Sequence, residues 1–134
     1  MSAEKLATIH AFASNSPWSL ESLTQQIAQV GTILIEREHA FALGRAILDE
    51  AELLQIATHP DHQRQGLGFS VLANFERSAK ANGCSRAFLE VAQDNSAAIT
   101  LYSRSGWHKD GLRKGYYRLA NGQREDAILM SKNL

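Results

Sequence analysis

A glycine-containing segment, QRQGLG at residues 63–68, joins a predicted strand to a predicted helix. Glycine has no Cβ, so the backbone can approach a ligand closely there. The first turn of a helix leaves about four amide N–H groups without intrahelical partners, and the helix dipole favours anions at that end. The segment therefore predicts a site for a phosphate or a pyrophosphate. The six residues alone leave open the alternative of a tight turn that binds nothing.

Two common nucleotide-binding motifs do not fit this segment. A P-loop requires a lysine followed by a serine or threonine after its last glycine, and no such pair follows Gly68. A dinucleotide-binding fingerprint requires a third glycine where Val71 stands. The pattern that remains is Gln-x-x-Gly-x-Gly, formed by Gln63, Gly66 and Gly68.

The elements that must position this segment alternate between helices and strands. Apolar residues at helical spacing, together with capping residues, predict helices over 3–13, 19–30, 67–82 and 97–104. Short apolar stretches predict strands over 32–36, 40–48, 52–58, 86–91, 107–110, 115–119 and 126–132. Short polar turns between the first three strands favour antiparallel hairpins, and Gly44 predicts a bulge or bend. This order indicates a layered α/β or α+β protein with a mixed sheet.

The composition fits one ordinary globular domain over residues 1–134. The chain carries 14 basic and 14 acidic side chains, so its formal net charge is zero. That balance argues against a dedicated nucleic-acid or anionic-membrane binder, which would need a basic patch. No stretch approaches the ~20 apolar residues of a membrane span, and no signal-peptide pattern opens the chain. We therefore expect a cytoplasmic protein with no nucleic-acid or membrane partner.

Cysteine and histidine give no sign of a metal site or a covalent nucleophile. Cys84 stands alone, follows the helix-ending Gly83, and is interpreted as a small hydrophobic residue. His59 and His62 flank a turn, but no carboxylate or cysteine pattern supports a metal there. We expect no metal cofactor.

A series of motifs resembles the GNAT family of acetyl-CoA-dependent N-acetyltransferases. The motifs are ELLQIATHPDHQRQGLG at 52–68, FLEV at 88–91 and DNSAAITLYSRSGW at 94–107. Within that family, the chain is most similar to the bacterial ribosomal-protein N-terminal alanine acetyltransferases, through PWS at 17–19, LEV at 89–91 and NSAAITLYSRSGW at 95–107. The tail RKGYYRLANGQREDAILM at 113–130 adds to this similarity. The resemblance runs from about residue 17 to residue 131 and implies a splayed mixed sheet flanked by helices.

The resemblance also implies where acetyl-CoA binds, between the two central strands of that sheet. Main-chain groups of Ile56, Ala57 and Thr58 would hydrogen-bond the pantetheine arm as another strand would, and Asn95 would contact its far end. The pyrophosphate would be held by loop amides, those of Arg64, Gln65, Gly66, Leu67, Gly68 and Phe69. Phe69 replaces a small polar or basic residue common in the family, which we expect to weaken coenzyme affinity at most.

Acetyl transfer to an amine requires two proton movements. An α-ammonium group, with a pKa of about 8, must lose a proton before it attacks, and the departing thiolate must gain one. The resemblance implies Glu90 as the base, Tyr102 as the acid, and a backbone N–H of residues 56–58 as the oxyanion donor. Partial burial would raise the pKa of Glu90. The residues alone leave open the alternatives that Glu90 is a solvent-facing glutamate of a strand and that Tyr102 is an aromatic residue of the core.

The acceptor side is predicted to be lined by Arg113, Tyr116 and Tyr117, with a solvated strand as the alternative. Arg118 stands where the subfamily usually has a proline. The implied reaction is direct transfer from acetyl-CoA to the N-terminal alanine or small residue of a ribosomal protein, without an acyl-enzyme. Two alternatives remain, a GNAT enzyme that acetylates a small-molecule amine and a non-catalytic CoA-binding module.

The start of the chain departs from the family pattern. Family members usually open with a strand and a turn, whereas the first helix is predicted here almost from Met1. We therefore expect the first strand of the family's sheet to be absent, and this expectation motivates the non-catalytic alternative. A missing strand would leave an exposed sheet edge, and a homodimer that covers the edge is one expectation.

Overall fold

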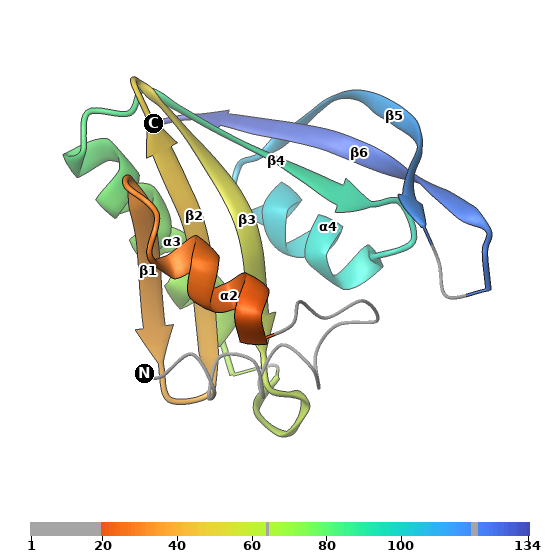
Figure 1. The fold of residues 1–134 in the computed structure, drawn as a ribbon, viewed down its shortest axis with the longest axis horizontal. Helices are drawn as coiled ribbons and strands as arrows, with labels where there is room; N and C mark the ends of the chain where they lie inside the picture. Colours follow the sequence, from red (N-terminus) through yellow and green to blue (C-terminus); the bar gives the residue numbers. More distant parts are fainter. Residues whose placement is uncertain (1–19, 64, 119–120) are drawn as a thin grey trace.

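The structure is a computed structural model that describes residues 20–63, 65–118 and 121–134 (Figure 1). The helix predicted over 3–13 and the predicted absence of a strand before it both fall outside these residues.

The helices and strands of the described chain follow the predicted order. The helices are α2 (Leu20–Ile27), the 3-10 helix η1 (Pro60–His62), α3 (Leu67–Ala81) and α4 (Ser96–Arg104). The strands are β1 (Thr32–Arg37), β2 (Ala40–Ile47), β3 (Glu50–Thr58), β4 (Arg86–Ala92), β5 (His108–Arg118) and β6 (Arg124–Asn133). The two strand pieces predicted over 107–110 and 115–119 form one strand, β5, that contains irregular pairing.

Helix α2 ends earlier than its apolar pattern predicts. The pattern continues to Val30, but the helix stops at Ile27. The hydroxyl of Thr32 lies 2.8 Å from the carbonyl oxygen of Gln26, so it satisfies a C-terminal carbonyl group of the helix. Residues 28–31 then form turns that lead into β1.

The strands form one mixed sheet in the order β1-β2-β3-β4-β6-β5. All neighbours are antiparallel except β3 and β4, which are parallel. Their parallel pairing covers only Glu50–Glu52 against Arg86–Phe88, and beyond it the two strands diverge (Figure 1). The predicted hairpins and the predicted splayed mixed sheet are therefore confirmed.

The irregularity predicted at Gly44 lies in the pairing of β2 with β3. Leu43 pairs with Gln55 while Gly44 pairs with Leu53, so the extra residue is Leu54, on β3. The bulge is thus where we predicted it, but β3 carries it. An extra residue shifts the alternation of side chains, so Leu53 and Ile56 both face α3.

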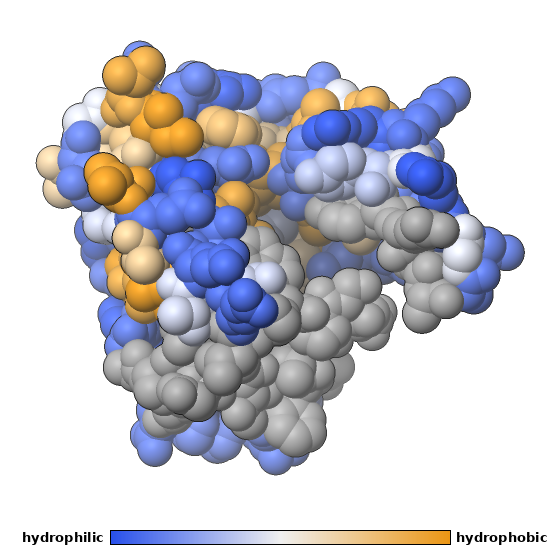
Figure 2. Space-filling model, viewed as in Figure 1, coloured by the Kyte–Doolittle hydropathy of each residue, from blue (hydrophilic) through white to orange (hydrophobic). Residues whose placement is uncertain are grey.

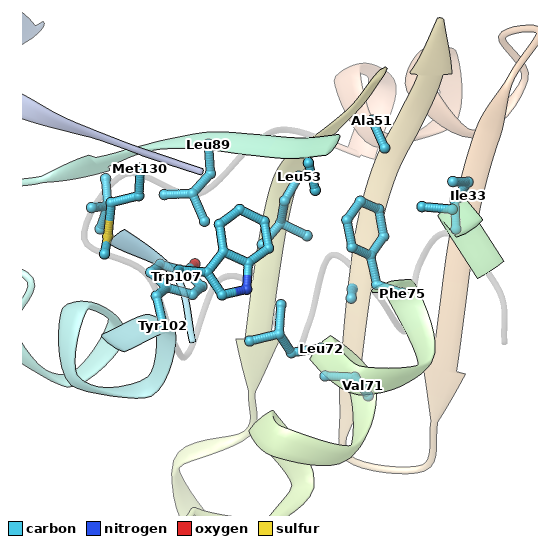
Figure 3. Packing of buried hydrophobic residues seen from close by; sticks show 14 of the residues in the cluster. Ile33, Ala51, Leu53, Val71, Leu72, Phe75, Leu89, Tyr102, Trp107 and Met130 are labelled. Carbon is cyan, nitrogen blue, oxygen red and sulfur yellow. The ribbon is translucent and has the colours of Figure 1, made fainter. Parts of the chain in front are cut away.

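The core is packed between the sheet and the helices α3 and α4 (Figure 3). Phe75 and Leu72 of α3 pack against Leu53 of β3, and Tyr102 and Trp107 pack beside Leu89 of β4. A second buried group, Phe41, Leu43 and Ala57, lies on the opposite face of β2 and β3, where α2 lies (Figure 1). The sheet is therefore covered on both faces along β1–β3, and the open part of the molecule lies where β3 and β4 separate.

Within the described chain, the helices are all too short or too polar to cross a bilayer.

Candidate active site

Glu90 lies just beyond the point where β3 and β4 separate. Phe88 is the last residue of β4 that pairs with β3. The neighbouring Leu89 and Val91 are buried in the core, so Glu90 projects from the other face of the strand, the face on which α2 lies over β1–β3. Its side chain is 21% exposed. The structure therefore places a partly buried carboxylate at the opening of the sheet.

Arg113 and Tyr116, both predicted on the acceptor side, meet at Glu90. Arg113 Nη1 lies 2.9 Å from Glu90 Oε1. The Tyr116 phenol donates a hydrogen bond to the Glu90 carboxylate, and this bond is the largest cause of the raised pKa of Tyr116, followed by burial. The Arg113 guanidinium lies 4.1 Å from the centroid of the Tyr116 ring. These contacts surround the Glu90 carboxylate with a cation and a neutral donor.

A bulge in β5 directs Tyr116 toward Glu90. Arg113 pairs with Ala127 and Tyr117 pairs with Glu125, so three residues of β5 lie opposite Asp126 alone. The Gly115 N–H donates to Asp126 Oδ1 at 2.8 Å and fixes the bulge. Sequence reasoning missed Asp126, although a glycine inside a strand is a recognised sign of a bulge. The side chain of Tyr117 lies outside what the structure describes.

A second carboxylate, Glu52 of β3, also belongs to this face and was missed. Glu52 pairs in register with Phe88, and paired residues of parallel strands project to the same side of the sheet. Glu90 lies two residues after Phe88, so its side chain projects to that side too. Burial raises the pKa of Glu52, the nearby charge of Glu90 raises it further, and Arg45 opposes both. A glutamate at an alternating position of an apolar strand was the only sequence feature that could have pointed to Glu52. Its closeness to Glu90 depends on the parallel register of β3 and β4, which the sequence does not reveal.

Tyr102 lies on the opposite face of the sheet from Glu90, in the buried cluster. It lies on α4, is only 5% exposed, and packs against Trp107 with ring centroids 6.0 Å apart (Figure 3). Leu89 and Val91 belong to the same buried cluster. The structure thus shows the aromatic packing role of Tyr102. It does not bring Tyr102 into the Glu90 cluster, because the two side chains lie on opposite faces of β4.

The edge of β3 beyond Glu52 offers main-chain groups to a ligand. The His59 N–H donates to the His39 carbonyl at 2.8 Å, so the ladder alternation directs the main chain of Ala57 toward β2 as well. The main-chain groups of Ile56 and Thr58 therefore face the other edge, toward β4. That edge has no paired strand among the described residues after Glu52. Of the three predicted residues, two present their main chains there and Ala57 does not.

The glycine loop begins α3 with an open first turn. Gly66 has a φ of 77°, a left-handed conformation that glycine adopts without strain, and no side chain caps the helix there. The first helical bond runs from the Ser70 N–H to the Gly66 carbonyl at 3.0 Å. The N–H groups of residues 67–69 come before that bond, so they have no acceptor within the helix and can donate hydrogen bonds to an anion. Gln65 and Phe69 are exposed here, and Arg64 lies outside the described chain.

Asn95 acts as the N-cap of α4. Its Oδ1 accepts a hydrogen bond from the Ala98 N–H at 3.2 Å. The side-chain amide nitrogen, a donor of two hydrogen bonds, is not used by the cap. The predicted contact of Asn95 with the coenzyme is thus compatible with its structural role.

The histidines near the glycine loop stack instead of converging. The rings of His39 and His62 lie 3.4 Å apart with planes 1° from parallel. The nitrogen lone pairs of stacked rings lie in separate parallel planes, so they do not point at one ion. In the part of the chain that the structure describes, no group of three or more His, Cys, Asp or Glu side chains is arranged to hold a metal.

In the space-filling view, the surface is hollowed between the part over α2 and the part over β5, with hydrophilic residues on both sides (Figure 2). The site therefore has two sides: a strand edge and helix turn that fit an extended phosphorylated ligand, and a polar cluster around Glu90.

Comparison with known proteins gives consistent similarities. Residues 7–107 match the model of the acetyltransferase (GNAT) family. A [ribosomal protein bS18]-alanine N-acetyltransferase of Escherichia coli strain K12 is 38% identical over 131 residues, covering 91% of this chain and 82% of the relative. The crystal structure of the ribosomal-protein-S18-alanine N-acetyltransferase from Escherichia coli matches with a TM-score of 0.87 and 33% identity, covering 98% of this chain and 86% of that one.

A more distant structure shares the fold alone. Arabidopsis thaliana NAA60, solved in complex with acetyl-CoA, matches with a TM-score of 0.84 at 16% identity, covering 99% of this chain and 93% of that one.

Proposed function

The chain belongs to the GNAT acetyltransferase family, and we propose that it acetylates the N-terminal amine of a ribosomal protein, with acetyl-CoA as donor. The observation that carries this proposal is the divergence of β3 and β4 after Glu52 and Phe88, with Glu90 at the opening. The relatives named for acetylation of the bS18 alanine support the acceptor, because they match this chain over nearly its whole length.

The family uses acetyl-CoA, which supplies the acetyl group as a reactive thioester. We propose that Ile56 and Thr58 bind the pantetheine arm through their main chains, with Ala57 between them. The amides of residues 64–69 would hold the pyrophosphate, and Asn95 would contact the arm. The fit rests on two features of the chain, the unpaired edge of β3 and the uncapped first turn of α3.

The chemistry requires one base and one acid on either side of the thioester carbon. Glu90 would accept a proton from the acceptor ammonium, so that the neutral amine attacks. As the C–N bond forms, the C–S bond would break and the thiolate would take a proton from the Tyr102 phenol. The second proton of the attacking amine would then restore the phenol. The Ile56 N–H would stabilise the negative charge that develops on the carbonyl oxygen. The opposite faces from which Glu90 and Tyr102 project support this division of roles.

The acceptor peptide would lie on the Glu90 side. Arg113 and Tyr116 contact Glu90 directly, and Tyr117 follows them on β5. We propose that these three residues line the path of the peptide. The whole chain, residues 1–134, would form one catalytic domain that acts in the cytoplasm, where a ribosomal acceptor is made. The homodimer stays a prediction that sedimentation of the purified protein would check.

One observation favours a second candidate, acetylation of a cationic small molecule such as a polyamine. Glu52 and Glu90 place two carboxylates on the acceptor side. Arg45 and Arg113 lie beside them, so the charges of the four groups cancel. That balance fits a peptide with a single ammonium group better than a polycation.

The test is turnover of acetyl-CoA with a short peptide that begins with alanine, measured by mass spectrometry of the peptide. The same peptide with a blocked N-terminus and a polyamine serve as alternative acceptors. We expect the alanine peptide to be acetylated, with a large loss of kcat/KM in a variant that combines Glu90→Gln and Tyr102→Phe. Glu38→Gln, an exposed glutamate in the β1–β2 turn, is the control. Full turnover by the double variant would contradict the proposed mechanism.

A further inference from the structure

The carboxylate of Glu52 lies in the acceptor site in a position that the transfer chemistry does not use. Glu52 and Phe88 are partners in the parallel register, and Glu90 follows two residues later on the same face. A strand spacing of about 4.8 Å and a rise of about 3.3 Å per residue put the Cα atoms of Glu52 and Glu90 on the order of 8 Å apart. Two glutamate side chains can span that separation around one small group.

The two carboxylates differ in their surroundings. Glu90 is held by the guanidinium of Arg113 and by the Tyr116 phenol. The cation that acts on Glu52 is Arg45, whose Nη2 donates to Gln26 of α2 and whose Nε is buried without a partner. Glu52 therefore pays a desolvation cost and faces the like charge of Glu90, and a cation placed between the two would relieve both.

We propose that Glu52 is a docking residue for the acceptor, holding its α-ammonium group together with Glu90 before the proton is removed. This inference rests on the proposed function, because it assigns the acceptor amine to the Glu90 side of the sheet. The ligand is defined by its chemistry: a primary ammonium at the end of a peptide, with no acidic side chain close to it. An aspartate as second residue of the peptide would add a third negative charge to the site.

The geometry also explains how one cation is exchanged for another. Arg113 is 56% exposed, so its guanidinium can move into solvent at little desolvation cost when an ammonium group arrives. Glu52 lies on β3, behind the opening, and stays in place. The incoming ammonium would replace Arg113 at Glu90 while Glu52 adds a second, fixed charge-assisted hydrogen bond.

The experiment compares Glu52→Gln with wild type using peptides that begin Ala-Lys, Ala-Ser and Ala-Asp. We expect the KM for Ala-Ser to rise roughly tenfold, the size of a lost charge-assisted hydrogen bond, with kcat changed less than about threefold. The preference for the Ala-Lys peptide over the Ala-Asp peptide should be smaller in Glu52→Gln than in wild type. Glu52→Asp, which keeps the charge, should recover part of the affinity. Glu50→Gln is the matched control on the same strand, because Glu50 is paired with Arg86 away from Glu90.

Peptide binding measured by calorimetry with CoA present gives a readout that does not require turnover. An unchanged KM and an unchanged peptide affinity in Glu52→Gln would overturn the docking role while leaving the acetyltransferase intact. An equal effect on acetyl-CoA binding would also overturn it, because Glu52 would then act through the fold. A wild-type protein that binds peptide but acetylates none would instead overturn the proposed function.

Discussion

Arg113 reaches across β6 to place its Nη1 2.9 Å from Glu90 Oε1. The two residues lie on β5 and β4, which are separated by β6 in the sheet. An arginine that reaches across a neighbouring strand restricts the orientation of the Glu90 side chain. The ion pair is half-exposed, so its value lies in orientation more than in stability.

Removing this guanidinium should slow acetyl transfer without unfolding the protein. In Arg113→Gln, Glu90 loses the donor that orients it before the acceptor ammonium takes the place of the guanidinium, and we expect kcat/KM for an alanine peptide to fall roughly tenfold. The change in the free energy of unfolding should stay under about 1 kcal/mol, because the pair is exposed. Arg113→Lys should lose less, since it keeps the charge. Steady-state kinetics and urea unfolding measure the two effects, and wild-type kcat/KM in Arg113→Gln would refute the orienting role.

The hydrogen bond from Tyr116 to Glu90 makes a spectroscopic prediction. The bond raises the pKa of Tyr116, because ionising the phenol would remove the donor and set two negative charges together. A raised pKa means that the neutral donor persists above the usual value of about 10, and that the contribution of the bond to stability is lost only as the pH rises beyond it. Titration by phenolate absorbance should show a late-titrating tyrosine that is missing in Tyr116→Phe. In Glu90→Gln that tyrosine should titrate earlier, and an unchanged curve would contradict the bond.

Asp126 should affect binding of the acceptor peptide indirectly, because it stabilises the bulge of β5. Its carboxylate accepts the Gly115 N–H, and the bulge directs Tyr116 over Glu90. In Asp126→Ala we expect the KM for the peptide to rise roughly fivefold, while the affinity for acetyl-CoA stays the same. Asp126→Asn keeps an acceptor oxygen and should recover most of the loss. Equal losses for peptide and acetyl-CoA would point to a general change of fold.

Much of the fold was predictable because local signals agree with the final structure. Short polar turns gave the β1-β2-β3 hairpins, and the capping oxygen of Asn95 gave the start of α4. The end of α2 was not predictable from its apolar pattern, because it depends on the Thr32 hydroxyl that arrives from the following strand. The continuity of β5 was hidden because its bulges interrupt the alternation of side chains.

The site divides in the same way. Glu90, Arg113 and Tyr116 were predicted from motifs, and the structure brings them together. Glu52 was missed because its place beside Glu90 follows from a parallel register three residues long, between strands separated by a helix. Asp126 was missed because its role depends on which β5 residues lie opposite it. Non-local pairing of this kind leaves no pattern within a single stretch of sequence.

The raised pKa of Glu52 predicts a pH dependence of stability. The folded protein holds the proton of Glu52 more tightly than the unfolded chain does, so this group favours folding below its usual pKa of 4.5 and the benefit is lost as the pH rises through its folded value. Glu52→Gln should therefore gain stability relative to wild type between pH 4 and pH 7. The gain should be less than about 1 kcal/mol, because the group is only partly buried.

Urea unfolding at the two pH values measures this gain, with Glu38→Gln, an exposed glutamate, as the control. A constant difference between Glu52→Gln and wild type would mean that Glu52 is not destabilised by its site. A gain in stability together with a loss of peptide affinity would separate the docking role from a structural one.

The packing of α3 on the sheet depends on the missing side chain of Gly44. A Cβ at this position would lie 2.4 Å from Phe75 Cε2 and 2.4 Å from the carbonyl oxygen of Glu52. Phe75 is fully buried, and the carbonyl belongs to the ladder next to the bulge, so neither can move freely. Gly44→Ala should therefore lower the free energy of unfolding by about 1–3 kcal/mol, the usual cost of overpacking.

Gly111→Ala is the matched control, because a Cβ there meets only Leu129 Cδ1 at an ordinary 3.8 Å. Phe75→Leu in the Gly44→Ala background should restore part of the loss, since the smaller side chain makes room for the methyl group. Urea unfolding of the three variants measures these differences. If Gly44→Ala were as stable as wild type, α3 would have to lie farther from β2 than the structure places it.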